Sequence, residues 1–88
     1  MQLRFTAQAW DDYLYWQSQD MDVLRKINGL IKDIRRDPFR GVGQPEALKG
    51  DLAGWWSRRI TQEHRLVYRV RGKGEEQEVQ IAQCRLHY

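Results

Sequence analysis

Residues 55–60 read WWSRRI and residues 65–70 read RLVYRV, with the polar tetrapeptide TQEH between them. Both segments alternate apolar and polar side chains, which is typical of half-buried β-strands. They predict an antiparallel hairpin whose turn is residues 61–64. The alternation predicts that the following side chains share one face of each strand: Trp56, Arg58 and Ile60 on the first, and Leu66, Tyr68 and Val70 on the second.

The opposite face of this hairpin is rich in arginine. It consists of Trp55, Ser57 and Arg59 on the first strand and Arg65, Val67 and Arg69 on the second. Cross-strand neighbours lie about 5 Å apart, so the hairpin should bring Arg59 and Arg65 together. Two guanidiniums held on a rigid sheet suit a phosphate, and we expect an anion-binding pair here.

Length and composition indicate one small domain. The 88 residues include four Trp, four Tyr and two Phe, and each aromatic side chain buries roughly 150–250 Å², which helps a small core. No apolar run approaches the roughly 20 residues of a membrane span. The N-terminus begins with a strand-like pattern instead of a signal peptide. We therefore expect a cytoplasmic protein with no membrane partner.

The cysteine and histidine content and the net charge limit which kinds of site and partner the chain can have. Cys84 is the single cysteine, so no internal disulfide can form, and with two histidines there is no metal-ligand spacing. We expect neither a metal nor another cofactor. The net charge of +3 permits a polyanionic partner without requiring one.

The N-terminal part of the chain predicts a strand and two helices. Residues 2–5 alternate, and Thr6 can cap a helix over residues 7–18. Within that helix we expect Trp10 and Leu14 to be core residues, although an aromatic stripe at helical spacing can also form a ligand platform.

The second helix is predicted from Asp20, as N-cap, to Arg36, before the Asp37-Pro38 pair. Its Gly29 would allow close approach of another element. The sequence favours neither of two interpretations of its basic side: a solvated helix face, or a surface that contacts nucleic acid. The apolar stripe is Val23, Leu24, Ile27, Leu30, Ile31 and Ile34, and the basic side is Arg25, Lys26, Lys32, Arg35 and Arg36.

Residues 38–54 form a long glycine-containing segment, which in a small domain suggests a functional loop. It carries Glu46 and Lys49. A last strand is predicted over residues 78–85, with Cys84 buried, and the chain closes with His87 and Tyr88. Such an end is either frayed or, if the last strand pairs beside the hairpin, close to the arginines.

Together these residues fit metal-free cleavage of RNA. Glu46 would accept the proton of a ribose 2'-hydroxyl, whose oxygen attacks the adjacent phosphate, and His87 would protonate the departing 5'-oxygen. Because the nucleophile is internal, no metal is needed. The cations Arg59, Arg65 and Lys49 would stabilise the phosphate, and Tyr88 would stack on a base.

Four segments resemble YoeB-type toxins of the RelE superfamily. They are LIKDIRRDPF (30–39), GQPEALK (43–49), WSRRITQEHRLVY (56–68) and CRLHY (84–88). The resemblance covers nearly the whole chain and implies an α+β fold, in which an N-terminal strand and two helices precede a three-stranded antiparallel meander packed on the helices. It places the acid-base pair and phosphate-binding cations on Glu46, Arg65 and His87, with Lys49, Arg59 and Tyr88 in support.

The same resemblance implies the toxin of a type II toxin-antitoxin pair, formed by residues 1–88 as one domain. Such a toxin is a ribonuclease that enters the ribosomal A site and cuts mRNA. Its implied partners are a cognate antitoxin, ribosomal RNA and a second copy of itself. Ala47 and Leu86 depart from the residues usual in the family, so contacts beside Glu46 and His87 can differ.

Two other classes of function share these arginines. One is a non-catalytic module that binds RNA or a partner protein, and the other is a ribonuclease that works without the ribosome. A binding module has no use for a base and an acid on either side of a phosphate. The presence of Glu46 and His87 therefore favours a nuclease over a binding module. Whether cleavage requires ribosomes distinguishes the two kinds of nuclease.

Overall fold

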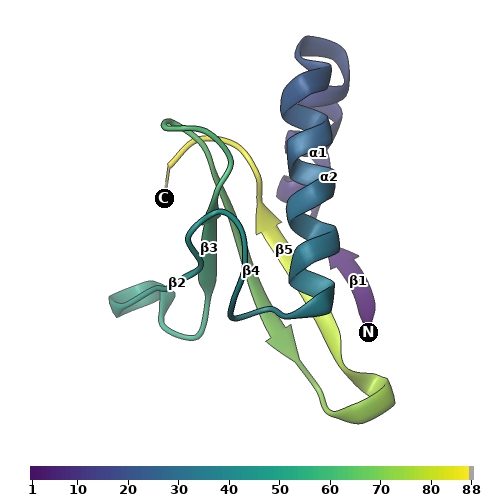
Figure 1. Ribbon diagram of the computed structural model, residues 1–88, viewed down its shortest axis with the longest axis vertical. Helices are drawn as coiled ribbons and strands as arrows, with labels where there is room; N and C mark the ends of the chain where they lie inside the picture. The colour runs from purple at the N-terminus through teal and green to yellow at the C-terminus, as the bar shows by residue number, and fades with distance from the viewer. Residues whose placement is uncertain (88) are drawn as a thin grey trace.

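Residues 1–87 are described by the structure, a computed structural model in which two helices pack against a single sheet (Figure 1). The elements are β1 (Gln2–Phe5), α1 (Ala7–Gln19), α2 (Met21–Arg36), β2 (Glu46–Ala47), β3 (Trp56–Arg59), β4 (Arg65–Arg71) and β5 (Glu78–Gln83). Short 3-10 turns lie at Gly50–Leu52 and Gly74–Glu76. The predicted α+β class is confirmed.

The sheet has five strands in the order β1-β5-β4-β3-β2. The expected antiparallel meander β3-β4-β5 forms its centre. Two features go beyond the prediction: β1 pairs in parallel with β5, and β2 adds an edge strand inside the segment predicted to be irregular. A two-residue strand such as β2 is too short to produce an alternation pattern in the sequence.

The core lies between the two helices and one face of the sheet. We call the other face, which carries Ser57 and Val67 and which neither α-helix covers, the open face. The residues that build the core from both layers include Leu24, Ile27, Leu30, Ile31, Ile34, Ile60, Leu66, Tyr68, Val79 and Ile81.

Helix α1 begins as predicted, because the Thr6 side chain accepts a hydrogen bond from the Ala9 backbone nitrogen at 3.1 Å. The predicted core residues are wrong, since Trp10 is 48% exposed and Leu14 is 41% exposed. The helix instead buries Ala9, Asp12 and Trp16. Its buried stripe is shifted because the Asp12 carboxylate and the Trp16 indole find polar partners at the end of β5, which a pattern of apolar residues cannot reveal.

Trp10 is part of an aromatic cluster at the margin of the core. Its ring stacks on Tyr13 with centroids 5.7 Å apart and meets Phe5 edge-on at 5.9 Å. The helical spacing of these aromatics therefore reflects packing against β1 at the edge of the domain, where the residues are partly exposed.

Helix α2 agrees with its prediction at both ends and along its buried stripe. Asp20 accepts hydrogen bonds from the backbone nitrogens of Asp22 and Val23, and Asp37 is the C-cap. Val23 is half-buried, whereas the rest of the stripe is buried. The expectation for Gly29 is wrong, because a Cβ added there would have no neighbour within 4 Å. Gly29 leaves space beside α2 instead of admitting another element.

The β3–β4 hairpin has the predicted register. Arg59 pairs with Arg65, and the turn between them is closed by the Thr61 hydroxyl, which accepts hydrogen bonds from the backbone nitrogens of Glu63 and His64 at 3.2 Å. This closed turn fixes the ends of both strands, so the two arginines start from a rigid backbone.

Cys84 follows β5 and is fully buried, as predicted. Burial, followed by the nearby Asp12 carboxylate, raises the pKa of the Cys84 thiol to about 12. The residue therefore acts as a small neutral core group. Among residues 1–87, no helix has the length and apolar character needed to cross a bilayer.

Candidate functional site

Glu46 lies on the edge strand β2 and is exposed. It pairs with Ser57 of β3, which pairs with Val67 of β4, which pairs in turn with Gln83 of β5. Residues paired across neighbouring strands point to the same face of a sheet. Glu46 therefore belongs to the open face, at the end of a row whose middle members, Ser57 and Val67, are buried.

Arg59 and Arg65 form the next row on the open face, two residues along their strands from Ser57 and Val67. Arg59 is exposed and Arg65 is half-buried. One terminal nitrogen of Arg65 donates hydrogen bonds to the carbonyl oxygens of Thr61 at 2.7 Å and His64 at 3.0 Å. The turn therefore holds this guanidinium in place, which reduces the conformational entropy lost when an anion binds.

The C-terminal segment is tied to the same turn. The backbone nitrogen of Leu86 donates to Nδ1 of His64 at 2.8 Å, and the Leu86 carbonyl oxygen accepts from the Arg65 backbone nitrogen at 3.0 Å. His87 is the next residue and is exposed. The chain is thus not frayed up to Leu86, and it delivers His87 to the end of the hairpin where the arginines lie.

Helix α1 holds the start of this segment through both backbone groups of Cys84. Asp12 accepts a hydrogen bond from the Cys84 nitrogen at 3.0 Å, and the Trp16 indole donates to the Cys84 oxygen at 2.8 Å. Trp16 also meets the His64 ring edge-on, with centroids 4.8 Å apart. Asp12, Trp16 and His64 position the C-terminal segment up to Leu86, and none of them was singled out from the sequence.

Lys49 is exposed and occupies the N-cap position of the 3-10 turn that follows β2, without a capping hydrogen bond from its side chain. It lies three residues beyond Glu46 in the sequence. Tyr88 lies outside the described residues, so its predicted stacking on a base stays a prediction. The described part of the site therefore combines one carboxylate, one imidazole and several cations on and beside the open face.

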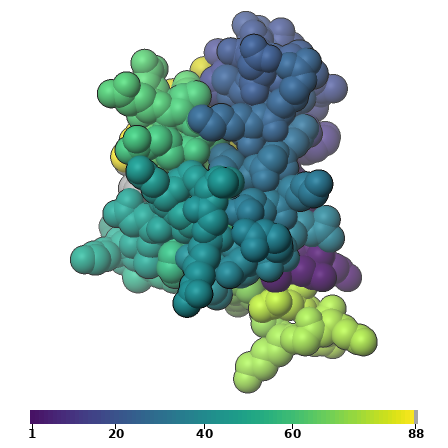
Figure 2. Space-filling model, viewed as in Figure 1, coloured from purple at the N-terminus to yellow at the C-terminus, as the bar shows by residue number. Residues whose placement is uncertain are grey.

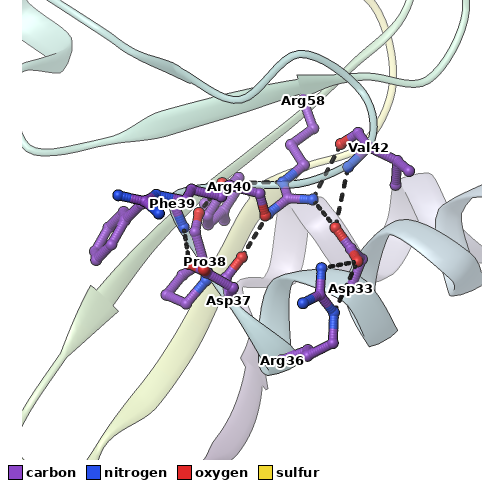
Figure 3. Close-up of polar contacts among 9 residues, drawn as sticks. Asp33, Arg36, Asp37, Pro38, Phe39, Arg40, Val42 and Arg58 are labelled. Carbon is purple, nitrogen blue, oxygen red and sulfur yellow. Dashed lines mark hydrogen bonds and ion pairs between the residues drawn. The ribbon is translucent and has the colours of Figure 1, made fainter.

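Arg58 is the most completely coordinated arginine of the described chain, and sequence reasoning gave it no role. It is fully buried, and every nitrogen of its guanidinium is used (Figure 3). Nε donates to the Tyr68 hydroxyl, and the terminal nitrogens donate to Asp33 and to backbone oxygens. The backbone acceptors are those of Asp37 at 2.8 Å, Arg40 at 3.0 Å and Val42 at 3.0 Å.

This network fastens the segment between α2 and β2. Tyr68 donates to the carbonyl oxygen of Pro38, and the Arg59 backbone nitrogen donates to Gly43 at 2.7 Å. Gly43 has a φ of +83°, and a Cβ there would lie 2.9 Å from the Leu30 side chain. The backbone leading to Glu46 is therefore closely packed and hydrogen-bonded, which defines where Glu46 enters the sheet.

A signal for Arg58 was present in the sequence. Its position in the alternating strand placed it on the core-facing side with Trp56 and Ile60, and a charge there needs a buried partner. The partner is Asp33, whose pKa is lowered to about 2 by hydrogen bonds from Arg36 and Arg58. The carboxylate thus stays ionised at any physiological pH.

The basic side of α2 is exposed, as predicted, and part of it is locally paired: Arg25 contacts Asp22 at 2.7 Å and Arg36 contacts Asp33 at 2.9 Å. A groove of about 480 Å³ runs between α2 and residues 42–44, next to Gly29. Figure 2 shows this side of the molecule, where α2 adjoins the segment that contains residues 42–44. Arg59, from the row of the open face next to Glu46 and Ser57, also lines the groove.

No group of three or more His, Cys, Asp or Glu side chains within residues 1–87 is arranged to hold a metal ion. The candidate site offers acid-base and cationic groups from protein side chains. A carboxylate, an imidazole and arginines around one surface are the set required to deprotonate a hydroxyl, stabilise a charged phosphate and protonate a leaving group.

Comparison with known proteins gives one consistent result. The profile of the family described as "YoeB-like toxin of bacterial type II toxin-antitoxin system" matches residues 5–88. Toxin YoeB of Escherichia coli is 56% identical over 88 residues, covering both chains completely. Toxin YoeB of Streptomyces coelicolor is 52% identical over the same length, again covering all of both chains.

Solved structures agree with these sequence matches. The YoeB/ParE toxin from Agrobacterium tumefaciens is 57% identical and superposes with a TM-score of 0.97 over 100% of both chains. The YoeB dimer from Staphylococcus aureus is 44% identical with a TM-score of 0.88, covering 100% of this chain and 98% of that one. A heterotetrameric YoeB-YefM toxin-antitoxin complex from the same organism matches with a TM-score of 0.87. The chain therefore belongs to the YoeB-like toxins of bacterial type II toxin-antitoxin systems.

Proposed function

We propose that this toxin is a ribosome-dependent endoribonuclease, formed by residues 1–88 as a single domain, that cuts mRNA in the ribosomal A site and so inhibits translation. The observation that carries the proposal is the hydrogen bond from the Arg65 backbone nitrogen to the Leu86 oxygen. It joins the C-terminal segment to the hairpin one residue before His87, beside Arg65 of the open face, which supports a role for His87 together with the arginines.

In this mechanism Glu46 accepts the proton of a ribose 2'-hydroxyl as its oxygen attacks the neighbouring phosphorus. The bond to the 5'-oxygen breaks, and His87 donates a proton to that oxygen. The products are a 2',3'-cyclic phosphate and a new 5'-hydroxyl end. Arg65 and Arg59 stabilise the negative charge on the phosphate, with Lys49 beside Glu46 and Tyr88 stacking on a base.

The partners follow from the same function. A cognate antitoxin neutralises the toxin in the cytoplasm, where the ribosome is also found. We further propose a homodimer, because the chain is similar to a YoeB that was solved as a dimer. Among the described residues, the exposed cations of α2 are available for ribosomal RNA.

Cleavage mapping tests this proposal. Purified toxin is added to mRNA with and without programmed ribosomes, and the new 5' ends are mapped. Cuts should appear only with ribosomes, within the A-site codon, and should be lost in Glu46→Ala and His87→Ala. Glu75→Ala, in the exposed 3-10 turn between β4 and β5, is the matched carboxylate control and should cut normally. Cuts without ribosomes would identify a free ribonuclease, and intact mRNA in both tubes would contradict the proposal.

A further inference from the structure

Trp55 and Arg69 form a second feature of the open face. Arg69 lies two residues beyond Val67 on β4, so it points to the same side of the sheet. Its guanidinium carbon lies 4.3 Å from the centroid of the Trp55 ring. This pair is on the other side of the Glu46–Ser57–Val67 row from Arg59 and Arg65, so the row lies between two cationic positions.

The Arg69 guanidinium is held in place by other side chains of the open face. Its Nε donates to Gln80 at 2.7 Å, and the Gln80 amide donates to Glu78 at 2.6 Å. Glu78 also lies 3.6 Å from Nε of Arg4 on β1. This polar chain crosses three strands and keeps Arg69 over the indole, while both members of the pair remain only half-buried.

A half-buried stack of this kind can serve structure alone, since a cation over an indole contributes about 0.5–1 kcal/mol at exposed sites. Its position suggests more. Rows two residues apart on a strand are separated by about 7 Å, so the pair lies next to the row that ends in Glu46, the proposed base. Unstacked RNA bases bind on aromatic rings and on guanidinium planes. At this position a guanidinium and an aromatic ring already lie against each other.

We propose that Trp55 and Arg69 form a base-stacking subsite for single-stranded RNA, which receives a nucleotide next to the one that is cut. The inference rests on the proposed ribonuclease function and extends it to substrate selection. Stacking strength increases with the area of the ring system, so the subsite favours a purine over a pyrimidine. Its cation also faces the phosphate that leads into this nucleotide.

The first experiment compares cleavage of programmed ribosomes whose A-site codons carry either a purine or a pyrimidine at each position. In Arg69→Gln and Trp55→Leu, kcat/KM for the preferred purine codon should fall about tenfold, with a much smaller fall for the pyrimidine codon. Arg71→Gln is the matched control: it removes the same charge from the same strand and face, outside the ring contact. It should keep the purine preference.

A second measurement does not depend on cleavage. A short single-stranded RNA containing 2-aminopurine, with 2'-O-methyl groups to prevent cutting, is titrated with the toxin. Stacking should quench the fluorescence with wild type and Arg71→Gln, and Arg69→Gln should lose the quenching. Trp55→Phe, which keeps an aromatic ring, should retain most of the quenching that Trp55→Leu loses, and melting temperatures identify any variant that fails to fold.

The two experiments separate the possible failures. If the toxin quenches 2-aminopurine but cuts nothing, the ribonuclease proposal fails and the stacking subsite stands. If wild type cuts and Arg69→Gln shows unchanged purine preference with unchanged quenching, the subsite is overturned. Equal loss on purine and pyrimidine codons, without loss of quenching, also overturns it, because it would indicate a purely structural contact.

Discussion

Arg58 and Arg59 are neighbours on β3 with opposite surroundings. Arg58 points toward the helices, has no exposed surface and donates to Asp33, Tyr68 and the backbone of residues 37–42. Arg59 points to the open face and is exposed. The pleat of one strand therefore gives two identical side chains different environments, and the comparison separates the charge that holds the fold from the charge offered to a ligand.

The difference shows how the two faces divide their tasks. On the helix-facing side, a buried cation orders the segment that leads to Glu46. On the open side, the backbone is rigid but the guanidinium of Arg59 stays in contact with water. Its desolvation cost arises only when a ligand binds. The predictions below test this division, beginning with the largest expected change in stability.

Arg58→Met should be the most damaging single substitution. It leaves three backbone oxygens without donors, and each unsatisfied acceptor that stays buried costs about 1–3 kcal/mol in free energy of unfolding, whereas Asp33 keeps its contact with Arg36. Urea denaturation measures the change. Arg59→Met is the matched control and should change stability by less than about 0.5 kcal/mol. Equal losses in the two variants would show that the faces do not differ in this way.

Asp12→Ala should have a smaller effect on stability and a clear effect on function. The Cys84 backbone nitrogen would lose its buried acceptor, which costs about 1–3 kcal/mol. Cleavage should also slow, because the C-terminal segment that carries His87 loses one of its anchors. Asp11→Ala, the exposed neighbour on α1, controls for the lost charge and should resemble wild type. Normal cleavage by folded Asp12→Ala would refute the anchoring role.

Acid should weaken the helix-facing network through Asp33. Its pKa is lower in the folded protein, about 2, than its usual value near 4, so its carboxylate contributes stability above the usual value. That contribution is lost as pH falls from about 4 to about 2. Urea midpoints over this range should therefore fall more steeply for wild type than for Asp33→Asn. Parallel curves would mean that Asp33 is not linked to folding.

Cys84 should show the smallest response. Because burial and Asp12 raise the pKa of its thiol to about 12, almost no thiolate forms near neutral pH. Iodoacetamide should leave the native toxin unmodified and react readily after denaturation, as measured by mass spectrometry. Rapid alkylation of the folded protein would indicate that the segment between β5 and His87 opens.

Much of this fold could be predicted from periodicity and capping. The α2 stripe, the Thr6 and Asp20 caps and the pairing of Arg59 with Arg65 each follow from local sequence rules. The error in α1 has a physical cause: apolar spacing marked Trp10 and Leu14, whereas the buried side was set by hydrogen bonds of Asp12 and Trp16 to a residue far away in the chain.

The candidate site likewise contains residues that could be predicted from the sequence and residues that could not. Residue types and resemblance predict Glu46, Arg65 and His87 as candidates, because each has a chemical task in the proposed reaction. The residues that position them could not be predicted from the sequence. His64 acts through a hydrogen bond from a backbone nitrogen to one of its ring nitrogens, and Arg58 acts through contacts with a loop that has no periodic pattern. Only the core-facing position of Arg58 signalled its need for a partner.

One measurement tests the assignment of tasks on the open face most directly. The A-site RNA is made with sulfur in place of the bridging 5'-oxygen at the scissile phosphate, so that the leaving group is a thiolate, which needs no proton from an acid. Cleavage by His87→Ala should recover to within about tenfold of wild type, whereas Glu46→Ala should stay slow, because the 2'-hydroxyl still requires a base. Recovery of Glu46→Ala, or no recovery of His87→Ala, would contradict the account.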